Sequence, residues 1–388
     1  MTGTPRLYYE DPLREAFRAR VVAHGRLGDR ATLVLDETAF YPESGGQLGD
    51  RGRLGGLTVA DVQVDDAGVV HHLVEGALPE IGAEVGGEID RARRRIHMAL
   101  HTGQHMLSRA LVDEAKAETV SARLGETACT IDVDVAKLAD ADVARAEALV
   151  NSIIEDDVTI RAWFPDAAEL AGLPLRRRPK VTEDIRVVAV GAFDYTPCGG
   201  THCLRSAQVG LVRVTGLERY KGQMRVTFAA GSRARAGLAA EAEVLRGLAR
   251  DFTCGPAEVP AAVAKLRREL GSAQQALGQS RARLANAAAE ELIRVARAAG
   301  QTLIVTTLPE GGAELARMIV KRIASEPELA ALVGAAGDDG GLHLVAARGA
   351  ASTVDCAALL RGVPGARGGG SAERAEGRAP AGAALTPP

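Results

Sequence analysis

The chain of 388 residues is long enough for two or three domains, and 46% of its residues are apolar, so it can bury sizeable cores. Only 3% of the residues are aromatic, so these cores must be mainly aliphatic and rich in alanine. A formal net charge of −3 excludes a protein that is basic throughout, and any binding of RNA must come from local basic patches.

The five cysteines show no spacing typical of a disulfide framework, which favours a reducing compartment. The sequence does not open with a signal peptide, and it contains no apolar run of about 18 residues that could cross a bilayer. We therefore expect a soluble, cytoplasmic protein.

Residues 1–90 predict a β-rich N-terminal subdomain. The segment Thr38–Gln47 contains Pro and Gly residues that predict a loop. On either side of this loop, pairs of short β-branched runs are separated by turns with Gly or Asp, which is typical of hairpins. These runs cover residues 18–24 and 31–37, and then 57–64 and 68–74.

From residue 91 to residue 232 the hydrophobic period is mixed, and we expect an α+β domain. A helix is predicted over 93–114 by an apolar stripe of Ile96, Leu100, Leu107 and Leu111. A second helix is expected over 143–154. Strands are expected over 158–164, 185–190, 211–216 and 224–229.

Residues 233–300 are almost entirely helix-forming, with an interruption at Cys254-Gly255-Pro256. A heptad seam runs along the second half of this segment, which favours either a helical hairpin or a dimer contact, and of the two we favour the hairpin. The seam consists of Val263, Leu270, Leu277 and Leu284, with Leu266, Ala273, Ser280 and Ala287 three positions later.

Residues 301–388 predict a C-terminal α/β domain with a disordered tail. A glycine tract covers 365–370, and the last dozen residues are rich in Ala, Gly and Pro, which is typical of disorder. Before the tract, strands are expected over 302–306, 331–334 and 342–347, and helices over 313–324 and 354–361.

Two short pairs of residues predict one zinc site per chain. His101 and His105 lie one helical turn apart, with β-carbons roughly 5–6 Å from each other, so both rings can reach one cation. Cys198 and His202 flank two glycines that allow a tight loop. Zinc takes His nitrogen and Cys sulfur, usually four ligands in a tetrahedron. His97 has the same spacing from His101, so the residues alone leave open which histidine pair binds.

The other histidines and cysteines suggest no further site. A zinc peptidase would need Glu directly after the first histidine, and Thr102 stands there instead. Cys203 is either a spare thiol or a packing residue. We expect ordinary surface or strand residues at His24, His71, His72 and His343, and small buried side chains at Cys129, Cys254 and Cys356.

Three segments in this order resemble the free-standing alanyl-tRNA editing proteins, the stand-alone relatives of the editing half of alanyl-tRNA synthetase. They are residues 38–50, 101–107 and 198–202. Residues 210–231 look like part of the second additional domain that this family shares with threonyl-tRNA synthetases. The C-terminal region resembles a domain shared with the synthetase and with DHH phosphoesterases. The resemblance thus implies an editing domain over 91–232, a helical or coiled-coil connector over 233–300, and a DHH-associated α/β domain over 301–388.

The resemblance also implies ligands and a reaction. The first histidine of the family motif precedes Thr or Ser, which selects His101 and His105 and leaves His97 out. The four ligands would hold one zinc ion beside a pocket where the ester of serine or glycine with tRNA(Ala) is hydrolysed in trans. Thr38, Gln47 and Asp50 are the candidate catalytic residues of the glycine-containing loop. Thr38 could form a hydrogen bond with the serine hydroxyl, or it could be a threonine at a strand end with no role in the reaction.

Candidate contacts to tRNA come from basic runs near the ligand pairs and from the matching segment at 221–225. We select Arg94, Arg95, Arg177, Arg178, Lys221 and Arg225, and the second run also contains Arg176 and Lys180. After the glycine tract the chain carries acidic residues where the family is usually more basic. We therefore do not expect this domain to bind tRNA tightly. A homodimer could form through residues 257–299 or through the C-terminal domain.

Two further hypotheses stand beside the hydrolase. Four protein ligands describe a closed, usually structural zinc site, so the chain could bind tRNA without hydrolysing it. A weaker alternative is action on threonyl-tRNA through the shared second domain. No segment precedes the β-rich region that could be an aminoacylation domain, so we do not expect a full synthetase.

Overall fold

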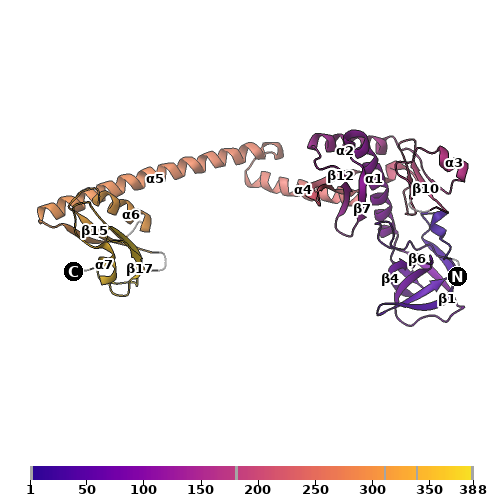
Figure 1. Ribbon diagram of the computed structural model, residues 1–388, viewed down its shortest axis with the longest axis horizontal. Helices are drawn as coiled ribbons and strands as arrows, with labels where there is room; N and C mark the ends of the chain where they lie inside the picture. Colours follow the sequence, from indigo (N-terminus) through magenta and orange to yellow (C-terminus); the bar gives the residue numbers. More distant parts are fainter. Residues whose placement is uncertain (1–2, 180–181, 310–311, 338–339, 386–388) are drawn as a thin grey trace. The chain divides into compact units, whose positions relative to one another are not determined.

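The computed structural model describes residues 3–179, 182–309, 312–337 and 340–385. The described residues have mixed α and β structure, with seven α-helices and several β-sheets, as the α+β prediction requires (Figure 1). The chain divides into two compact units, Met1–Leu245 and Arg246–Pro388, and each is described by itself. Among the described residues, we find no helix with the length and apolar character needed to cross a membrane.

A closed barrel forms the N-terminal part of the first unit, with strands paired in the order β1-β2-β5-β4-β3-β6 (Figure 1). Both predicted hairpins are present, as the antiparallel pairs β1–β2 and β4–β5. Phe17, Ala19 and Val21 are buried at alternate positions of β1, so this strand has one face in the barrel core. The strands are β1 (Ala16–Leu27), β2 (Arg30–Leu35), β3 (Gly52–Leu54), β4 (Leu57–Val64), β5 (Val70–Glu75) and β6 (Glu84–Ile89).

A short 3-10 turn, η1 (Leu7–Tyr9), precedes the barrel and fixes the loop that follows β2. The Leu7 amide donates to the Thr38 carbonyl at 2.8 Å, and the Thr38 amide donates to the Pro5 carbonyl at 3.0 Å. These two bonds hold the N-terminal turn against the start of the glycine-containing loop.

Helix α1 (Arg91–Ala115) follows the barrel and carries the first ligand pair. It begins at Asp90, whose side chain accepts from the Arg93 amide at 3.0 Å, and it ends at Lys116, which adopts a left-handed φ of 55°. Every residue from His97 to Ser108 is buried. The polar side chains of this segment are therefore enclosed by protein, where most buried polar groups form hydrogen bonds with other protein groups.

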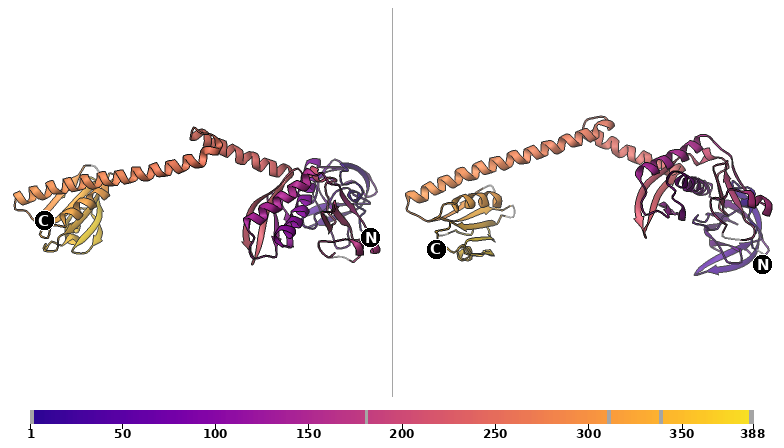
Figure 2. Two further views of the ribbon diagram at one scale, coloured as in Figure 1. Left: turned by 90° about the horizontal axis from the view of Figure 1, so that it is seen from above. Right: turned by 45° about the horizontal axis from the view of Figure 1, so that its top comes forward.

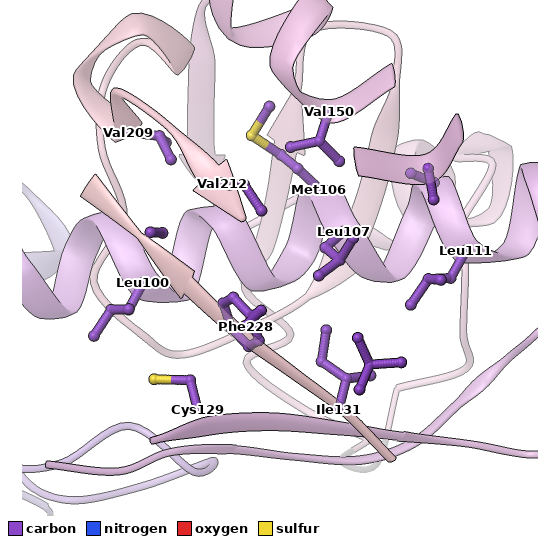
Figure 3. Close-up of a cluster of buried hydrophobic side chains, with 14 of the residues drawn as sticks. Leu100, Met106, Leu107, Leu111, Cys129, Ile131, Val150, Val209, Val212 and Phe228 are labelled. Carbon is purple, nitrogen blue, oxygen red and sulfur yellow. The ribbon is translucent and has the colours of Figure 1, made fainter. Parts of the chain in front are cut away.

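The core of the first unit packs around α1. Leu100, Leu107 and Leu111 face Phe228 and Ile131 of a four-stranded antiparallel sheet (Figure 3). Helix α2 (Asp140–Glu155) also packs against α1. The sheet has the order β12-β13-β8-β7, and its strands are β7 (Thr119–Leu124), β8 (Cys129–Val133), β12 (Val212–Tyr220) and β13 (Gln223–Ala230).

A smaller antiparallel sheet leads the chain to the second ligand pair. Its register places Trp163, Val187 and Pro197 in one row at the end of the sheet. The chain enters the Cys198 loop directly after this row. The order is β11-β10-β9, with β9 (Ile160–Trp163), β10 (Val187–Val190) and β11 (Asp194–Pro197), and the short elements α3 (Ala167–Gly172) and η2 (Ser206–Val209) lie in the connections.

Two helices, α4 (Gly231–Asp251) and α5 (Val259–Ala298), cover the predicted helical segment and are separated by η3 (Pro256–Glu258). The hairpin stays a prediction, because α4 belongs mostly to the first unit and α5 to the second. Helix α5 is continuous for 40 residues, and its seam leucines are exposed within its own unit. Its C-terminal part is buried through small residues and Ile293, which pack in a core with α6 (Gly312–Ile323). The exposed seam residues are Leu266 (52%), Leu270 (56%), Leu277 (51%) and Leu284 (58%).

The second unit contains a five-stranded sheet with helices on both faces. Ala331 and Val333 of β15 join one core with α5 and α6, and Leu332 joins another core with α7 (Cys356–Gly362), as strand alternation requires. Figure 2 shows α5 and α6 on the same side of this sheet. The order is β14-β15-β16-β18-β17, with β14 (Leu303–Leu308), β15 (Ala330–Ala336), β16 (Leu342–Arg348), β17 (Arg367–Gly370) and β18 (Arg374–Ala379).

The expected disordered tail is wrong for its first residues. Residues 377–379 belong to β18, which pairs with both β16 and β17, and β17 itself comes from the glycine tract. Ala375 and Ala379 are buried against the α7 side of the sheet. Small side chains carry a weak hydrophobic signal, so the composition suggested disorder where backbone pairing and alanine packing form a strand.

Candidate metal centre

The structure brings the four predicted zinc ligands together in the first unit. The ligand atoms of His101, His105, Cys198 and His202 all lie within 4.8 Å of one another. The first two come from one face of α1 and the last two from the loop after β11. The three histidines are buried and Cys198 is half-buried, so the cluster is enclosed on the histidine side.

The distances between these atoms suit a tetrahedral cation. Cys198 Sγ lies 3.5 Å from His101 Nε2 and 3.3 Å from His202 Nε2. Bond lengths of about 2.0–2.1 Å to nitrogen and about 2.3 Å to sulfur place neighbouring ligands of tetrahedral zinc roughly 3.4–3.6 Å apart. The donor set of three imidazoles and one thiol is also one that zinc accepts, so the residues fit the ion.

Polar partners orient two of the three rings. His101 Nδ1 lies 2.7 Å from Gln47 Oε1, so Nδ1–H donates to this amide oxygen and Nε2 faces the cluster. His202 Nδ1 lies 3.2 Å from Thr102 Oγ1. His105 Nδ1 is 3.8 Å from Asp194 Oδ2, which is an electrostatic contact longer than a hydrogen bond. Ligand histidines in metal sites are usually held in this way through their second nitrogen.

Burial sets the protonation state of the cluster. It lowers the pKa of His101 to about 3 and holds the pKa values of His105 and His202 well below the ordinary value. These rings are therefore neutral near pH 7, which is the form that donates a lone pair to a metal. Burial also raises the pKa of the Cys198 thiol, and a bound dication would offset this by favouring the thiolate.

The competing histidine, His97, lies outside the cluster. Its side chain is buried, and neither ring nitrogen has a hydrogen-bond partner among the described residues. Burial lowers its pKa to about 4. Although His97 has helical spacing from His101, the geometry pairs His101 with His105.

Comparison with known proteins agrees with the resemblance seen in the sequence. Residues 15–93 match the family of class II (A) tRNA synthetases, and residues 185–228 match the second additional domain of threonyl and alanyl tRNA synthetases. The alanyl-tRNA editing protein AlaX-L of Pyrococcus horikoshii is 36% identical over 239 residues, which cover 59% of this chain and 58% of that protein. These similarities are consistent with an AlaX-like protein.

An alanine–tRNA ligase of Pyrobaculum neutrophilum is 34% identical over 397 residues, which cover 97% of this chain and 42% of the ligase. The AlaX-like chain thus spans about half the length of the curated relatives that it matches. The matched second additional domain contains Cys198 and His202. His101 and His105 lie between the two matched regions.

The sequence did not indicate two residues that shape the ligand loop, residues 198–202, of the AlaX-like chain. Arg186 is buried and donates to the carbonyl oxygens of Cys198 at 3.1 Å and Gly200 at 2.9 Å. A Cβ on Gly200 would lie 2.2 Å from His101 Cε1, so only glycine lets the loop approach this ring. Glycine beside a ligand could have signalled the close approach, whereas no local pattern marks Arg186.

The three candidate catalytic residues have different surroundings. Gln47 lies at the cluster, where it contacts His101 and donates to Thr201 Oγ1 at 2.8 Å. Asp50 is 1% exposed, accepts from the Tyr41 amide at 2.6 Å, and pairs with Arg94 Nη2 at 2.5 Å. These bonds occupy its carboxylate inside the protein, and a catalytic role for Asp50 stays a prediction.

Thr38 is buried between the N-terminal turn and β5. Its Oγ1 lies 2.8 Å from His72 Nε2 and accepts from the Phe40 amide at 3.1 Å. His72 Nδ1 lies 2.9 Å from the Leu33 carbonyl and must donate to it, so the neutral ring accepts the Thr38 proton at Nε2. Only one lone pair of the Thr38 hydroxyl is left for a substrate, and its role in binding serine stays a prediction. His72, expected to be ordinary, is part of this buried network.

The candidate tRNA-binding residues differ in how far their side chains are exposed to solvent. Arg94 is 3% exposed and paired with Asp50, and its contact with phosphate stays a prediction. Arg225 lies 3.5 Å over the Tyr220 ring and pairs with Asp132 at 2.7 Å, which leaves it half-buried. Lys180 lies outside the described residues. The exposed candidates are Arg95, Arg177, Arg178 and Lys221.

The buried His72 predicts a loss of stability in acid. Burial lowers its pKa from 6.5 to about 4, so the unfolded chain takes up a proton below about pH 6.5 that the folded chain does not bind until about pH 4. Between about pH 7 and pH 5, this group should remove about 2 kcal/mol of stability. We expect His72→Gln to reduce the fall in the unfolding free energy over this interval by about that amount.

The measurement is chemical unfolding at both pH values, followed by the fluorescence of the one tryptophan, Trp163, which lies in the first unit. His24→Gln is the matched control, because His24 is an exposed histidine on the same barrel. Equal pH dependence in wild type and His72→Gln would refute the prediction.

Proposed function

We propose that the AlaX-like chain is a zinc-dependent hydrolase that removes serine, glycine or both from mischarged tRNA(Ala). The observation that supports this proposal most is the four-residue cluster with Gln47 bonded to His101. It occurs in a chain 36% identical to a protein named as an alanyl-tRNA editing protein. On this proposal residues 91–232 form the editing domain, and the protein acts in the cytoplasm.

The proposed reaction would correct errors that arise because an alanine-binding pocket discriminates poorly against serine and glycine. A pocket built for alanine rejects serine or glycine weakly, because one small group in an apolar pocket is worth only about 1–3 kcal/mol. A separate site that hydrolyses the wrong ester restores accuracy. Such a site needs to hold the acceptor end of the tRNA and to stabilise charge on the ester as it is attacked.

The residues of the cluster have separate tasks in this proposal. His101, His105, Cys198 and His202 would hold zinc, and Gln47 and Thr102 fix the first and last of these rings. When bound, zinc would supply Lewis acidity to the ester or to a water molecule. Gly199 is exposed and Cys198 half-buried, so the acceptor end would approach from this side of the loop.

Basic side chains would position the tRNA. Arg177 is exposed, and its charge acts on both Cys198 and His101, so it lies close to the cluster. A guanidinium there can neutralise a phosphate near the ester. We propose that Arg95, Arg178, Lys221 and the half-buried Arg225 contribute more distant contacts. The exposed leucine seam of α5 would allow a homodimer through residues 257–299.

A second candidate function is tRNA binding with a structural zinc and no hydrolysis. It is favoured by the cluster itself, because four protein ligands leave no open position for water, as is usual in structural sites. The two candidates differ in whether the wild-type protein releases the amino acid.

The decisive experiment measures deacylation of Ser-tRNA(Ala), Gly-tRNA(Ala) and Ala-tRNA(Ala), with zinc content determined on the same samples. We expect the wild type to release serine or glycine faster than alanine, and Cys198→Ala to lose both zinc and activity. Cys254→Ala is the matched control, since its thiol lies in the second unit. Binding of tRNA without release by the wild type would favour the second candidate. Full activity in Cys198→Ala would exclude the role proposed for zinc.

A further inference from the structure

Aromatic side chains gather beside the ligand loop of a chain in which only 3% of the residues are aromatic. Tyr8 lies at the base of this cluster, with its ring centroid 5.4 Å from that of Tyr41 and 4.8 Å from that of Tyr9. Tyr9 in turn lies edge-on to Phe164, at 5.5 Å between centroids. Tyr8 and Tyr41 are buried, Tyr9 is half-buried and Phe164 is 50% exposed, so the cluster leads from the core to the surface.

Strand register places the exposed end of the cluster near the ligands. Trp163, Val187 and Pro197 form the last paired row of the small sheet. Phe164 and Cys198 directly follow Trp163 and Pro197 in the sequence, and Arg186 directly precedes Val187 on the antiparallel middle strand. The Cys198 amide donates to the Arg186 carbonyl at 2.9 Å, which continues the pairing by one residue. Tyr9 reaches the same loop from η1, because a Cβ on Gly199 would lie 3.3 Å from the Tyr9 hydroxyl oxygen.

Positive charge surrounds these rings. The Arg186 guanidinium lies 4.8 Å from the centroid of Tyr9, and that of Arg6 lies 5.6 Å from it. Arg6 also donates to the Tyr9 hydroxyl at 2.8 Å. An exposed aromatic ring with guanidinium groups behind it is suited to a flat, electron-rich group attached to a polyanion, such as the unpaired base at an RNA end.

We propose that Phe164, supported by Tyr9, forms a stacking platform for the 3′-terminal adenine of the tRNA acceptor. This inference rests on the proposed function, since the amino-acid ester and the terminal base are attached to the same ribose. An ester that reaches the Cys198 loop must bring that base to the adjoining surface. Phe164 is the exposed ring of the cluster next to that loop.

The test uses binding of an uncharged RNA, so that it does not depend on hydrolysis. A fluorescent acceptor-stem hairpin of tRNA(Ala) ending in CCA is compared with the same RNA whose 3′-terminal residue is abasic. We expect the wild type to bind the intact RNA about 5- to 100-fold more tightly, as base stacking on an aromatic ring predicts. Phe164→Ala should abolish this preference, and Phe164→Trp should retain it.

Trp163→Ala is the matched control because Trp163 precedes Phe164 but has other partners, Arg161 and Glu169. It should keep the preference for the intact RNA. Circular dichroism and zinc content should be the same for wild type and Phe164→Ala, so that a loss of preference reports stacking alone. An equal preference in Phe164→Ala and wild type, or no preference in the wild type, would overturn the platform.

The outcome is separable from that of the proposed function. If the wild type prefers the intact RNA through Phe164 but releases no serine or glycine, the stacking platform is supported and the hydrolase is excluded. In an active enzyme, Phe164→Ala should raise KM by a similar factor and leave kcat unchanged. An unchanged KM would exclude the platform and leave the hydrolase in place.

Discussion

Gly200→Ala is expected to abolish tight zinc binding and the proposed deacylation together. The new Cβ would lie 2.2 Å from Cε1 and 2.4 Å from Nδ1 of His101, and 3.1 Å from Gln47 Oε1. His101 is a buried residue of α1, and its Nδ1 lies 2.7 Å from Gln47 Oε1. Its ring therefore cannot move away from the new Cβ and still direct Nε2 to the cluster. Loss of a hydrogen bond that orients a metal ligand usually lowers metal affinity by about 10- to 100-fold. We expect a loss of at least this size, because the new Cβ would displace His101 itself.

The change is measured by competition for zinc with a coloured chelator, together with the rate of serine release. Gly199→Ala is the matched control for zinc binding, because its Cβ would meet only the Tyr9 hydroxyl oxygen at 3.3 Å. We expect Gly199→Ala to retain its zinc. A Gly200→Ala protein with wild-type zinc affinity would show that the loop does not have to approach His101 so closely.

Asp50→Ala is expected to lower the unfolding free energy of the first unit by about 3–5 kcal/mol, because it leaves a buried guanidinium without its carboxylate. The side chains of Asp50 and Arg94 are 1% and 4% exposed, and Arg94 Nε and Nη2 both donate to the carboxylate. The carboxylate also accepts the Tyr41 amide, so its removal releases the glycine-containing loop that carries Gln47.

Unfolding in denaturant, followed by Trp163 fluorescence, measures this loss in the first unit. Glu84→Ala provides the comparison on the same barrel, since the Arg18–Glu84 pair has side chains 82% and 59% exposed. An exposed pair contributes about 0–1 kcal/mol, so Glu84→Ala should change little. A cost for Asp50→Ala as small as that for Glu84→Ala would contradict the structural role.

Much of the fold could be predicted because its signals are local. The apolar stripe predicted a helix over 93–114, and α1 covers Arg91–Ala115. The two N-terminal hairpins followed from short β-branched runs with turns between them. Predictions failed where a pattern had two physical meanings. The Ala- and Gly-rich composition of the C-terminal end predicted disorder, and part of this end forms paired strands.

The sequence predicted the four residues that the structure brings together, because the spacing of His101 and His105 and the glycines between Cys198 and His202 are local properties, and the resemblance left His97 out. The groups that surround the cluster come from distant parts of the sequence, so they could not be predicted from local patterns. Gln47 meets His101 across 54 positions, and Asp50 meets Arg94 across 44. A carboxylate and an arginine in separate motifs look like a catalytic residue and a phosphate contact. The structure buries the two side chains against each other, where each charge offsets the other, and the sequence did not indicate this pairing.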